Sequence, residues 1–256
     1  ERLMTWDPSQ YLRYDNERSQ PARDLIAALG DVNPMEIVDL GCGTGNSTAL
    51  LAQRWPDASL TGVDGSTEML NQASQSGVRA AWHAADIVTW RPDTPVDLIF
   101  SNAALHWLDN HTTLFPQLVG TLAEHGALAV QMPYNFSQPS HTLINDIANE
   151  PQWVERLHHV VRASPVAAPD HYLPILEPLV SSLRVWTTTY LHVLHGDHPV
   201  AEWTGGATLR PVIAALGDDA HAFIDEYKSR LTVAYPQRTD GTTVFPFTRM
   251  FIIAKR

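Results

Sequence analysis

Three glycines at alternate positions, Gly41, Gly43 and Gly45, separate a short apolar run from a segment with helical spacing. Glycine inside a strand or a helix lowers stability, so three glycines this close together need a geometric reason. Either the turn requires positive φ angles, or something approaches the backbone too closely for a side chain to fit. This constraint predicts a tight strand-to-helix turn over residues 38–48.

The surrounding sequence alternates between strand and helix patterns from residue 35 to residue 132. Such alternation predicts a parallel sheet that is covered by helices on both faces. A chain of 256 residues fits one large domain, or one domain with a substantial insertion. The expected strands are 35–40, 59–64, 78–86, 96–105 and 127–132, and the expected helices are 46–55, 66–77 and 111–126, the last of them stopping at Gly126.

The pattern changes after Pro133, where the sequence becomes richer in histidine, proline and polar residues. Helical pieces are expected at 140–149 and 151–162, a strand at 183–194, helices within 196–235 and a closing strand at 243–256. Pro246 is expected to sit at a bulge of the closing strand or to leave one site unpaired.

Charge and cysteine content exclude several classes of function. The formal net charge of −11 repels phosphate backbones, and no basic run opposes it, so we expect no nucleic-acid partner. Cys42 is the single cysteine, which excludes an internal disulfide and favours a reducing compartment. No apolar stretch approaches membrane-spanning length, so we expect a cytoplasmic protein with no membrane partner.

The glycine turn has the position of a cofactor site, because open α/β sheets bind ligands outside the carboxyl ends of their strands. Asp64 ends the next expected strand, about 20 residues beyond the turn, where its carboxylate could accept hydrogen bonds from both ribose hydroxyls of a nucleoside. A tight structural turn followed by an incidental surface acid is the alternative. A nicotinamide dinucleotide is disfavoured because Asn46 occupies the position of the third fingerprint glycine, and no tyrosine has a lysine four residues later.

Four segments resemble motifs of the class I S-adenosylmethionine-dependent methyltransferases: "VDLGCGTGN", Asp64, "AAD" at 84–86 and "DLIFSNAALHWL". The resemblance implies a Rossmann-like α/β fold whose seven-stranded sheet is mostly parallel and whose last strand is antiparallel. It also implies the cofactor S-adenosyl-L-methionine and the product S-adenosyl-L-homocysteine. The cofactor-binding residues that it implies are Tyr11, Arg18, Asp39, Gly41, Cys42, Gly43, Asn46, Asp64, Gly65, Met69, Asp86, Ile87, Asn102, Ala103 and His106.

Segments outside those motifs, among them "WTTTYLHVL", "TLRPVI" and "FPFTRMFIIA", are similar to the trans-aconitate methyltransferases, which esterify one carboxylate of a small unsaturated tricarboxylate. The implied partner is therefore a small polycarboxylate. The implied organisation is a single methyltransferase domain over 1–256, with an N-terminal lid and first helix at 1–30, a cofactor-binding core at 35–132, and helical insertions at 134–182 and 196–235 that roof the acceptor site.

A carboxylate acceptor is already ionised at neutral pH, so methyl transfer to it needs no general base. The enzyme then has to align the reacting atoms and to bind the remaining carboxylates, which bidentate arginine does best. We expect Arg210 to be the main anchor and Arg18 to assist it, although each could instead be a solvated or ion-paired surface residue. His106 leaves the fourth strand at the reaction centre, where it could contact the acceptor or orient a neighbour.

Aromatic residues offer further surface for the acceptor and the cofactor. Tyr190, Trp203 and Trp107 are expected to wall the acceptor site, with core packing as an equal competitor. No metal is expected, because His192 and His195 would point to opposite faces of a strand and no further ligands converge on them. Cys42 is not expected to act as a catalytic thiol, since nothing nearby would activate it.

Two other functions remain open from the sequence. The chain could methylate another small acid, a phenol or an amine, and a phenol or amine would need a base, which would make His106 more important than Arg210. It could also be a nucleoside-binding module without catalytic turnover.

Overall fold

The computed structural model of the 256-residue chain describes residues 15–161, 166–205 and 208–256. The chain divides into two compact units, which are described separately. The sheet unit comprises Asn16–Pro133, Pro165–Thr188 and Arg249–Arg256. The helical unit contains Tyr134–Ser164 and Thr189–Thr248. The two longest strands, β6 (Ser182–His195) and β7 (Thr242–Lys255), contribute residues to both units.

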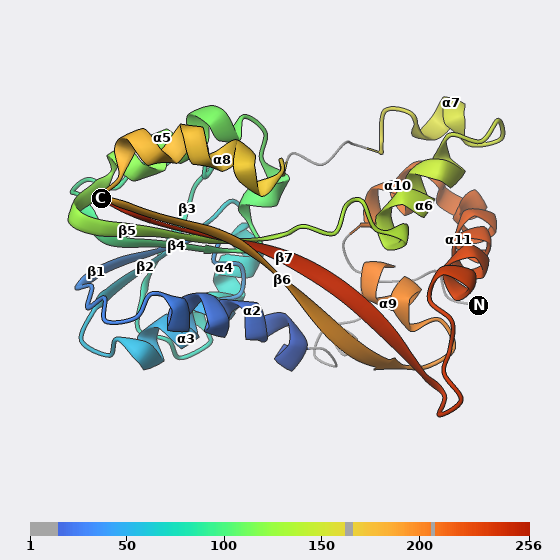
Figure 1. Ribbon diagram of the computed structural model, residues 1–256, viewed down its shortest axis with the longest axis horizontal. Helices are drawn as coiled ribbons and strands as arrows, with labels where there is room; N and C mark the ends of the chain where they lie inside the picture. The colour runs from blue at the N-terminus through green and yellow to red at the C-terminus, as the bar shows by residue number, and fades with distance from the viewer. Residues whose placement is uncertain (1–14, 162–165, 206–207) are drawn as a thin grey trace. The chain divides into compact units, whose positions relative to one another are not determined.

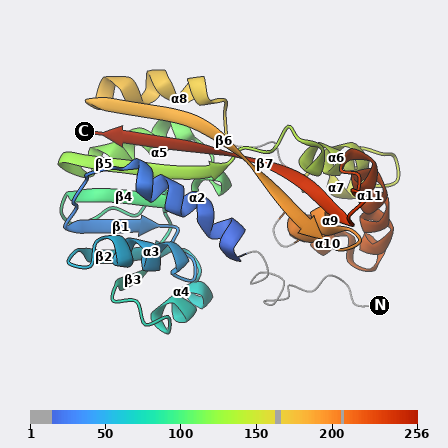
Figure 2. The same ribbon diagram turned by 60° about the horizontal axis from the view of Figure 1, so that its bottom comes forward.

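A seven-stranded sheet with the order β3-β2-β1-β4-β5-β7-β6 organises the sheet unit (Figure 2). Strands β1 to β5 pair in parallel, whereas β7 runs antiparallel to β5. This arrangement confirms the predicted fold class. The first five strands are β1 (Glu36–Leu40), β2 (Ser59–Asp64), β3 (Ala81–Ala84), β4 (Val96–Asn102) and β5 (Leu122–Pro133).

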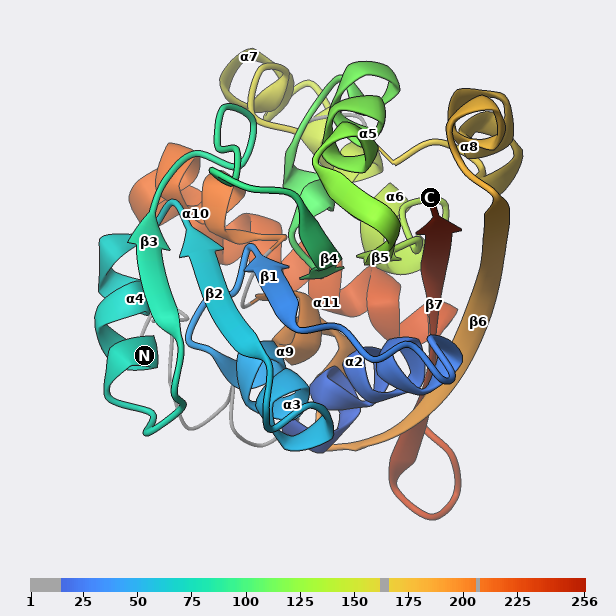
Figure 3. The ribbon, with the colours of Figure 1, turned by 90° about the vertical axis from the view of Figure 1, so that its left-hand side faces the viewer.

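Helices cover both faces of the sheet (Figures 1 and 3). One face carries α2 (Asp15–Ala28) and α3 (Asn46–Arg54), and the opposite face carries α5 (His111–Gly120) and α8 (Pro169–Leu176). Helix α4 (Thr67–Ser74) packs beside β3. The central strands are apolar on both faces, and Leu40, Leu98 and Leu128 are fully buried between the layers. Burial on both faces explains why these strands read as continuous apolar runs in the sequence.

The region around Gly126 differs from the sequence expectation. Helix α5 ends at Gly120 and β5 begins at Leu122, so Gly126 lies inside a strand and does not stop a helix. The pairing of β4 with β5 is irregular between Val96 and Leu98, and a Cβ on Gly126 would lie 3.0 Å from the carbonyl oxygens of Ala123 and Val96. The glycine therefore permits the close approach of backbones at an irregular point of the sheet.

Helix α8, which the sequence did not indicate, fixes the segment that follows β4. His111, at the start of α5, contacts the Tyr172 hydroxyl through Nδ1 at 2.7 Å and the carbonyl oxygen of Leu105 through Nε2 at 3.0 Å. A carbonyl only accepts, so Nε2 carries the proton and the tyrosine donates to Nδ1. Burial lowers the pKa of His111, which agrees with this neutral form. These bonds hold η1 (Leu105–Trp107), the short 3-10 helix that carries His106.

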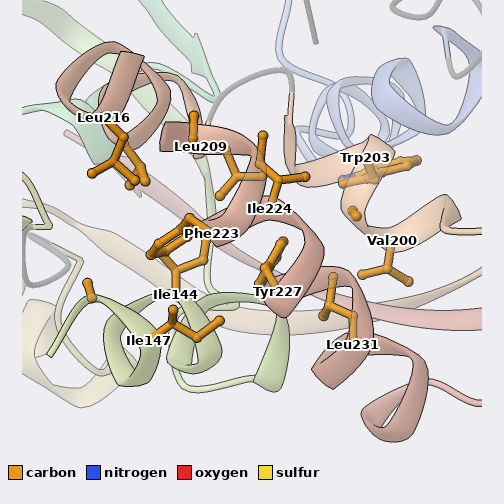
Figure 4. Close-up of a cluster of buried hydrophobic side chains, with 14 of the residues drawn as sticks. Ile144, Ile147, Val200, Trp203, Leu209, Leu216, Phe223, Ile224, Tyr227 and Leu231 are labelled. Atoms are coloured by element: carbon orange, nitrogen blue, oxygen red, sulfur yellow. The ribbon is translucent and has the colours of Figure 1, made fainter. Parts of the chain in front are cut away.

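The helical unit has its own hydrophobic cluster, which packs α6 (Pro139–Ala148) against α11 (Ala220–Ala234) (Figure 4). Its shorter helices are α7 (Val154–Leu157), α9 (Pro199–Gly205) and α10 (Arg210–Leu216). The Tyr227 hydroxyl is buried in this cluster and donates to the carbonyl oxygen of Ser140 at 2.7 Å. Sequence expectation and structure agree on α6, whereas the helix expected at 151–162 contracts to the single turn of α7.

The glycine turn yields a test of the fold. Gly41 has a φ of +79°, and a Cβ placed on it would lie 2.1 Å from the Cβ of Ala104; Gly77 has a φ of +78° with nothing within 4 Å. Gly41→Ala and Gly77→Ala should both incur the left-handed strain of about 1 to 2 kcal/mol. Only Gly41→Ala adds a steric clash, so it should lower the free energy of unfolding by about 1 to 3 kcal/mol more. Urea unfolding measures both values, and equal losses would contradict the packing at Gly41.

Candidate active site at the carboxyl edge of the sheet

The three glycines of the first turn have different roles, although all have positive φ angles of +79°, +54° and +86°. A side chain on Gly41 would collide with Ala104, and one on Gly45 would come within 3.0 Å of Trp82. The nearest atom to a Cβ on Gly43 is the Met69 sulfur at 3.8 Å. Close packing therefore explains Gly41 and Gly45, whereas a Cβ on Gly43 would make only an ordinary van der Waals contact with the Met69 side chain.

Asp64 connects this turn to the next one. Its Oδ2 accepts a hydrogen bond from the Gly43 N–H at 2.9 Å, and its Oδ1 accepts one from the Ser66 N–H at 2.8 Å. The Ser66 hydroxyl in turn caps α4 by accepting from the Met69 N–H at 3.3 Å. Each carboxylate oxygen has a second lone pair, so Asp64 can hold the turn and still accept a hydrogen bond from a ligand.

The remaining cofactor candidates gather along the same edge. The Ile87 side chain lies 3.3 Å from the position of a Cβ on Gly41. Ala103 has a φ of 54° and donates its N–H to the carbonyl oxygen of Gln131 at 2.9 Å. At the ends of β1 to β4, or in the turns and helix starts that follow them, lie Asp39, Gly41, Cys42, Gly43, Asn46, Asp64, Gly65, Met69, Asp86, Ile87, Asn102, Ala103 and His106. Tyr11 and the side chain of Arg18 are outside the described residues.

Asp39 is a fully buried carboxyl group near the end of β1. Its Oδ2 accepts hydrogen bonds from the hydroxyls of Ser47 at 2.8 Å and Thr48 at 2.6 Å. Its Oδ1 is buried without a hydrogen-bond partner in the described part of the chain. Burial raises the pKa of Asp39 to about 6, because the two hydroxyls only partly offset the loss of water.

Cys42 is buried inside the glycine turn. Burial raises the pKa of its thiol, and the nearby carboxylates of Asp39 and Asp64 raise it further. The thiol is therefore un-ionised at neutral pH, as expected for a residue without a nucleophilic role.

The acceptor candidates lie on both units. Trp107 is on η1 of the sheet unit, where 56% of its surface is exposed. In the helical unit, Trp203 is buried in the hydrophobic cluster and stacks on His192 with ring centroids 4.7 Å apart. Tyr190 also stacks on His192, with ring centroids 6.2 Å apart. Arg210 is exposed at the start of α10. The roles assigned to these residues in acceptor binding stay predictions.

Two buried polar residues at the same edge of the sheet were not selected from the sequence. Gln131 lies on β5 and is fully buried, and Arg249 lies on β7 with 6% of its surface exposed. Gln131 follows the apolar run 127–130 and Arg249 precedes the apolar run 250–254, and a polar residue beside such a run was the available signal. Among the described residues no cluster of histidine, cysteine and acidic side chains is suited to a metal ion, and no helix is both long and apolar enough to cross a bilayer.

The ionisation of Asp39 should be visible in the pH dependence of stability. Its pKa is raised in the folded state, so the folded protein binds the proton more tightly and loses stability as the pH rises from about 4 to 6. Asp39→Asn removes this charge. Its effect on the free energy of unfolding at pH 8 should be more favourable than its effect at pH 4 by about 2 to 3 kcal/mol. Urea unfolding of both proteins at both pH values measures this difference, and a pH-independent effect would contradict a buried, ionisable Asp39.

Comparison with known proteins identifies the family of the chain. Residues 37–126 match the profile of a family described as a methyltransferase domain. Trans-aconitate 2-methyltransferase from Azoarcus sp. (strain BH72) is 44% identical over 255 residues, covering 99% of this chain and 100% of the relative. The enzyme of that name from Streptomyces coelicolor is 46% identical over 264 residues, covering 98% of this chain and 87% of the relative.

Solved structures agree on the fold. YcgJ from Bacillus subtilis has a TM-score of 0.60 at 15% identity, covering 92% of this chain and 98% of that one. The plantazolicin methyltransferase BpumL in complex with SAH has a TM-score of 0.52 at 16% identity, covering 97% of this chain and 90% of that one. The predicted enzyme class and fold are thereby confirmed, and the chain belongs to the trans-aconitate 2-methyltransferase family.

Proposed function

We propose that this enzyme transfers a methyl group from S-adenosylmethionine to a carboxylate of a small polycarboxylic acid, and that trans-aconitate is its acceptor. Near full-length similarity to trans-aconitate 2-methyltransferases supports the acceptor. The observation that carries the cofactor assignment is the direct bond between the glycine turn and Asp64, at 2.9 Å. That hydrogen bond holds the glycine backbone beside a carboxylate, and a nucleoside could contact both.

The residues at this edge fit the cofactor. Asp64 has lone pairs left for ribose hydroxyls, and at Gly43 the missing side chain leaves backbone that a ligand could approach. Asp86 accepts a hydrogen bond from the Val88 N–H at 2.9 Å, which orders the segment assigned to the adenine. The free oxygen of Asp39 suits a positively charged group. Bound S-adenosylmethionine supplies an electrophilic methyl group on a cationic sulfur.

The protein's own part in the reaction is to position the acceptor. The acceptor carboxylate is ionised at neutral pH, so no side chain has to remove a proton from it. Holding two reactants in line within a dry site accounts for about 7 to 11 kcal/mol of rate acceleration in favourable cases. In this proposal Arg210 binds a carboxylate that does not react, assisted by Arg18, with Tyr190, Trp203 and Trp107 as apolar walls. His106 contacts or orients the reacting carboxylate.

A methyl-transfer assay with radiolabelled S-adenosylmethionine tests the overall function. Trans-aconitate should accept label, and the product should be a methyl ester that is cleaved by mild alkali. Transfer to a phenol or an amine without transfer to any polycarboxylate would refute the acceptor. Cofactor binding without transfer to any acceptor would favour a nucleoside-binding module.

Gly43 provides a test of the cofactor site that is separate from folding. Gly43→Ala should weaken the binding of S-adenosylhomocysteine at least about tenfold, because the new methyl group enters the space assigned to the ligand. Gly77→Ala is the matched control, since Gly77 also has a positive φ and free space around it but lies outside the site. Titration calorimetry measures both affinities. Equal affinities for the two variants would remove Gly43 from the site.

The relative importance of Arg210 and His106 distinguishes a carboxylate acceptor from one that needs a base. Arg210→Lys keeps the charge but loses the planar pair of donors, so kcat/KM for trans-aconitate should fall roughly 10- to 100-fold. His106→Ala should reduce it less, because no proton is removed. Arg238→Lys, at an exposed arginine of the helical unit, is the control. A harmless Arg210→Lys together with an inactive His106→Ala would contradict the proposed chemistry.

A further inference from the structure

A row of polar side chains crosses one face of the sheet near its carboxyl edge. Residues paired in register on neighbouring strands point to the same face, as do residues two apart on one strand. Asp39 pairs with Phe100, and Asn102 follows two residues later on β4. Asn102 pairs with Gln131, and Arg249 pairs with Pro133, two residues after Gln131. Asp39, Asn102, Gln131 and Arg249 therefore share one face.

Three polar atoms of the two amides in the middle of this row lack hydrogen-bond partners among the described residues. Both polar atoms of the Gln131 side chain, Oε1 and Nε2, are buried without a hydrogen bond to any described residue, and so is Oδ1 of Asn102. Gln131 has no exposed surface. A buried amide without partners costs folding free energy, so such a group in the interior needs an explanation. Its position next to the last residues of β4 and β5, where open α/β sheets bind ligands, points to a ligand.

The charges at the two ends of the row have opposite signs. Asp39 lies at the β1 end, and Arg249 lies at the β7 end, three strand spacings or roughly 14 Å away. Arg249 is the single buried arginine or lysine among the described residues. A guanidinium stays charged at any physiological pH and suits a planar carboxylate. The row thus runs from a site for a cationic methyl donor towards a site for an anionic acceptor.

We propose that Gln131 and Arg249 bind a carboxylate of the acceptor that is not methylated. The guanidinium of Arg249 donates to the carboxylate oxygens, and the Gln131 Nε2 donates to one of them. The row then sets the distance between the bound carboxylate and the methyl donor. This inference rests on the proposed polycarboxylate acceptor.

Gln131→Leu separates a ligand-binding role from a structural one. Leucine has nearly the same size and removes both unpartnered polar atoms, so the variant should unfold at the same temperature as wild type or a higher one. Its KM for trans-aconitate should nevertheless rise roughly 10- to 100-fold, while its affinity for S-adenosylhomocysteine stays within about twofold. Unchanged KM would overturn the proposal. A loss of cofactor affinity with unchanged KM would also overturn it, by assigning the amide to the cofactor.

Arg249→Gln tests the cationic part, with Arg184→Gln as the control. Arg184 lies on β6 of the same unit, is exposed and donates to the carbonyl oxygen of Ala28 at 3.1 Å. Arg249→Gln should lower kcat/KM for trans-aconitate roughly 10- to 100-fold, whereas Arg184→Gln should not. Itaconate, mesaconate and glutaconate each lack one of the three carboxylates of trans-aconitate. On the diacid that lacks the carboxylate bound by Arg249, the kcat/KM of Arg249→Gln should equal that of the wild type.

These results separate two kinds of failure. An active wild-type enzyme whose Arg249→Gln and Gln131→Leu variants keep normal kinetics on trans-aconitate would refute the row as an acceptor site and leave the proposed function intact. A wild-type enzyme that binds cofactor but methylates no polycarboxylate would refute the proposed function, and this inference with it.

Discussion

The two hydrogen bonds that Asp64 accepts from backbone N–H groups join two turns at the carboxyl edge of the sheet. One comes from the turn after β1 and the other from the start of the turn after β2, at 2.9 and 2.8 Å. The turns can share one carboxylate because the glycine backbone takes up left-handed conformations that other residues adopt at a cost. The glycine turn, the acid and the start of α4 are then held in one place by hydrogen bonds within the chain itself.

Buried charge is the other organising constraint of this edge. Asp39 and Arg249 are both removed from water, which lowers stability unless something compensates it. In the proposed reaction these two groups are complementary to a cationic methyl donor and an anionic acceptor. An active site built this way needs less reorganisation when the reactants bind, because its dipoles and charges are already fixed by packing.

Local sequence signals predicted the parts of the fold that depend on neighbouring residues. The glycine turn and the strand-helix alternation each have a local cause, and the structure confirms them. The predicted end of α5 was wrong because Gly126 was interpreted as a helix stop. Gly126 lies instead in β5, where its role depends on the pairing of β5 with β4, some thirty residues earlier in the chain.

In the candidate site, too, the sequence did not indicate features that depend on residues far apart in the chain. The cofactor candidates within the described residues follow strand ends, which the sequence marks, and their part in cofactor binding stays a prediction. Gln131 and Arg249 are more than 100 positions apart, and only the register of β5 with β7 brings them to one face. Trp203 was expected either to wall the acceptor site or to pack in the core, and it lies in a hydrophobic cluster; the sequence left this choice open because it depends on tertiary packing.

The burial of Cys42 makes the chain's single thiol a reporter of motion. Its sulfur lies 3.0 Å from where a Cβ on Gly62 would be, beneath the glycine turn, and its raised pKa leaves little thiolate to react. An alkylating reagent can therefore reach it only when the turn opens, so the rate of labelling measures how often the glycine turn opens locally. The single thiol of the sequence thus allows local opening of the glycine turn to be followed without introducing a label elsewhere.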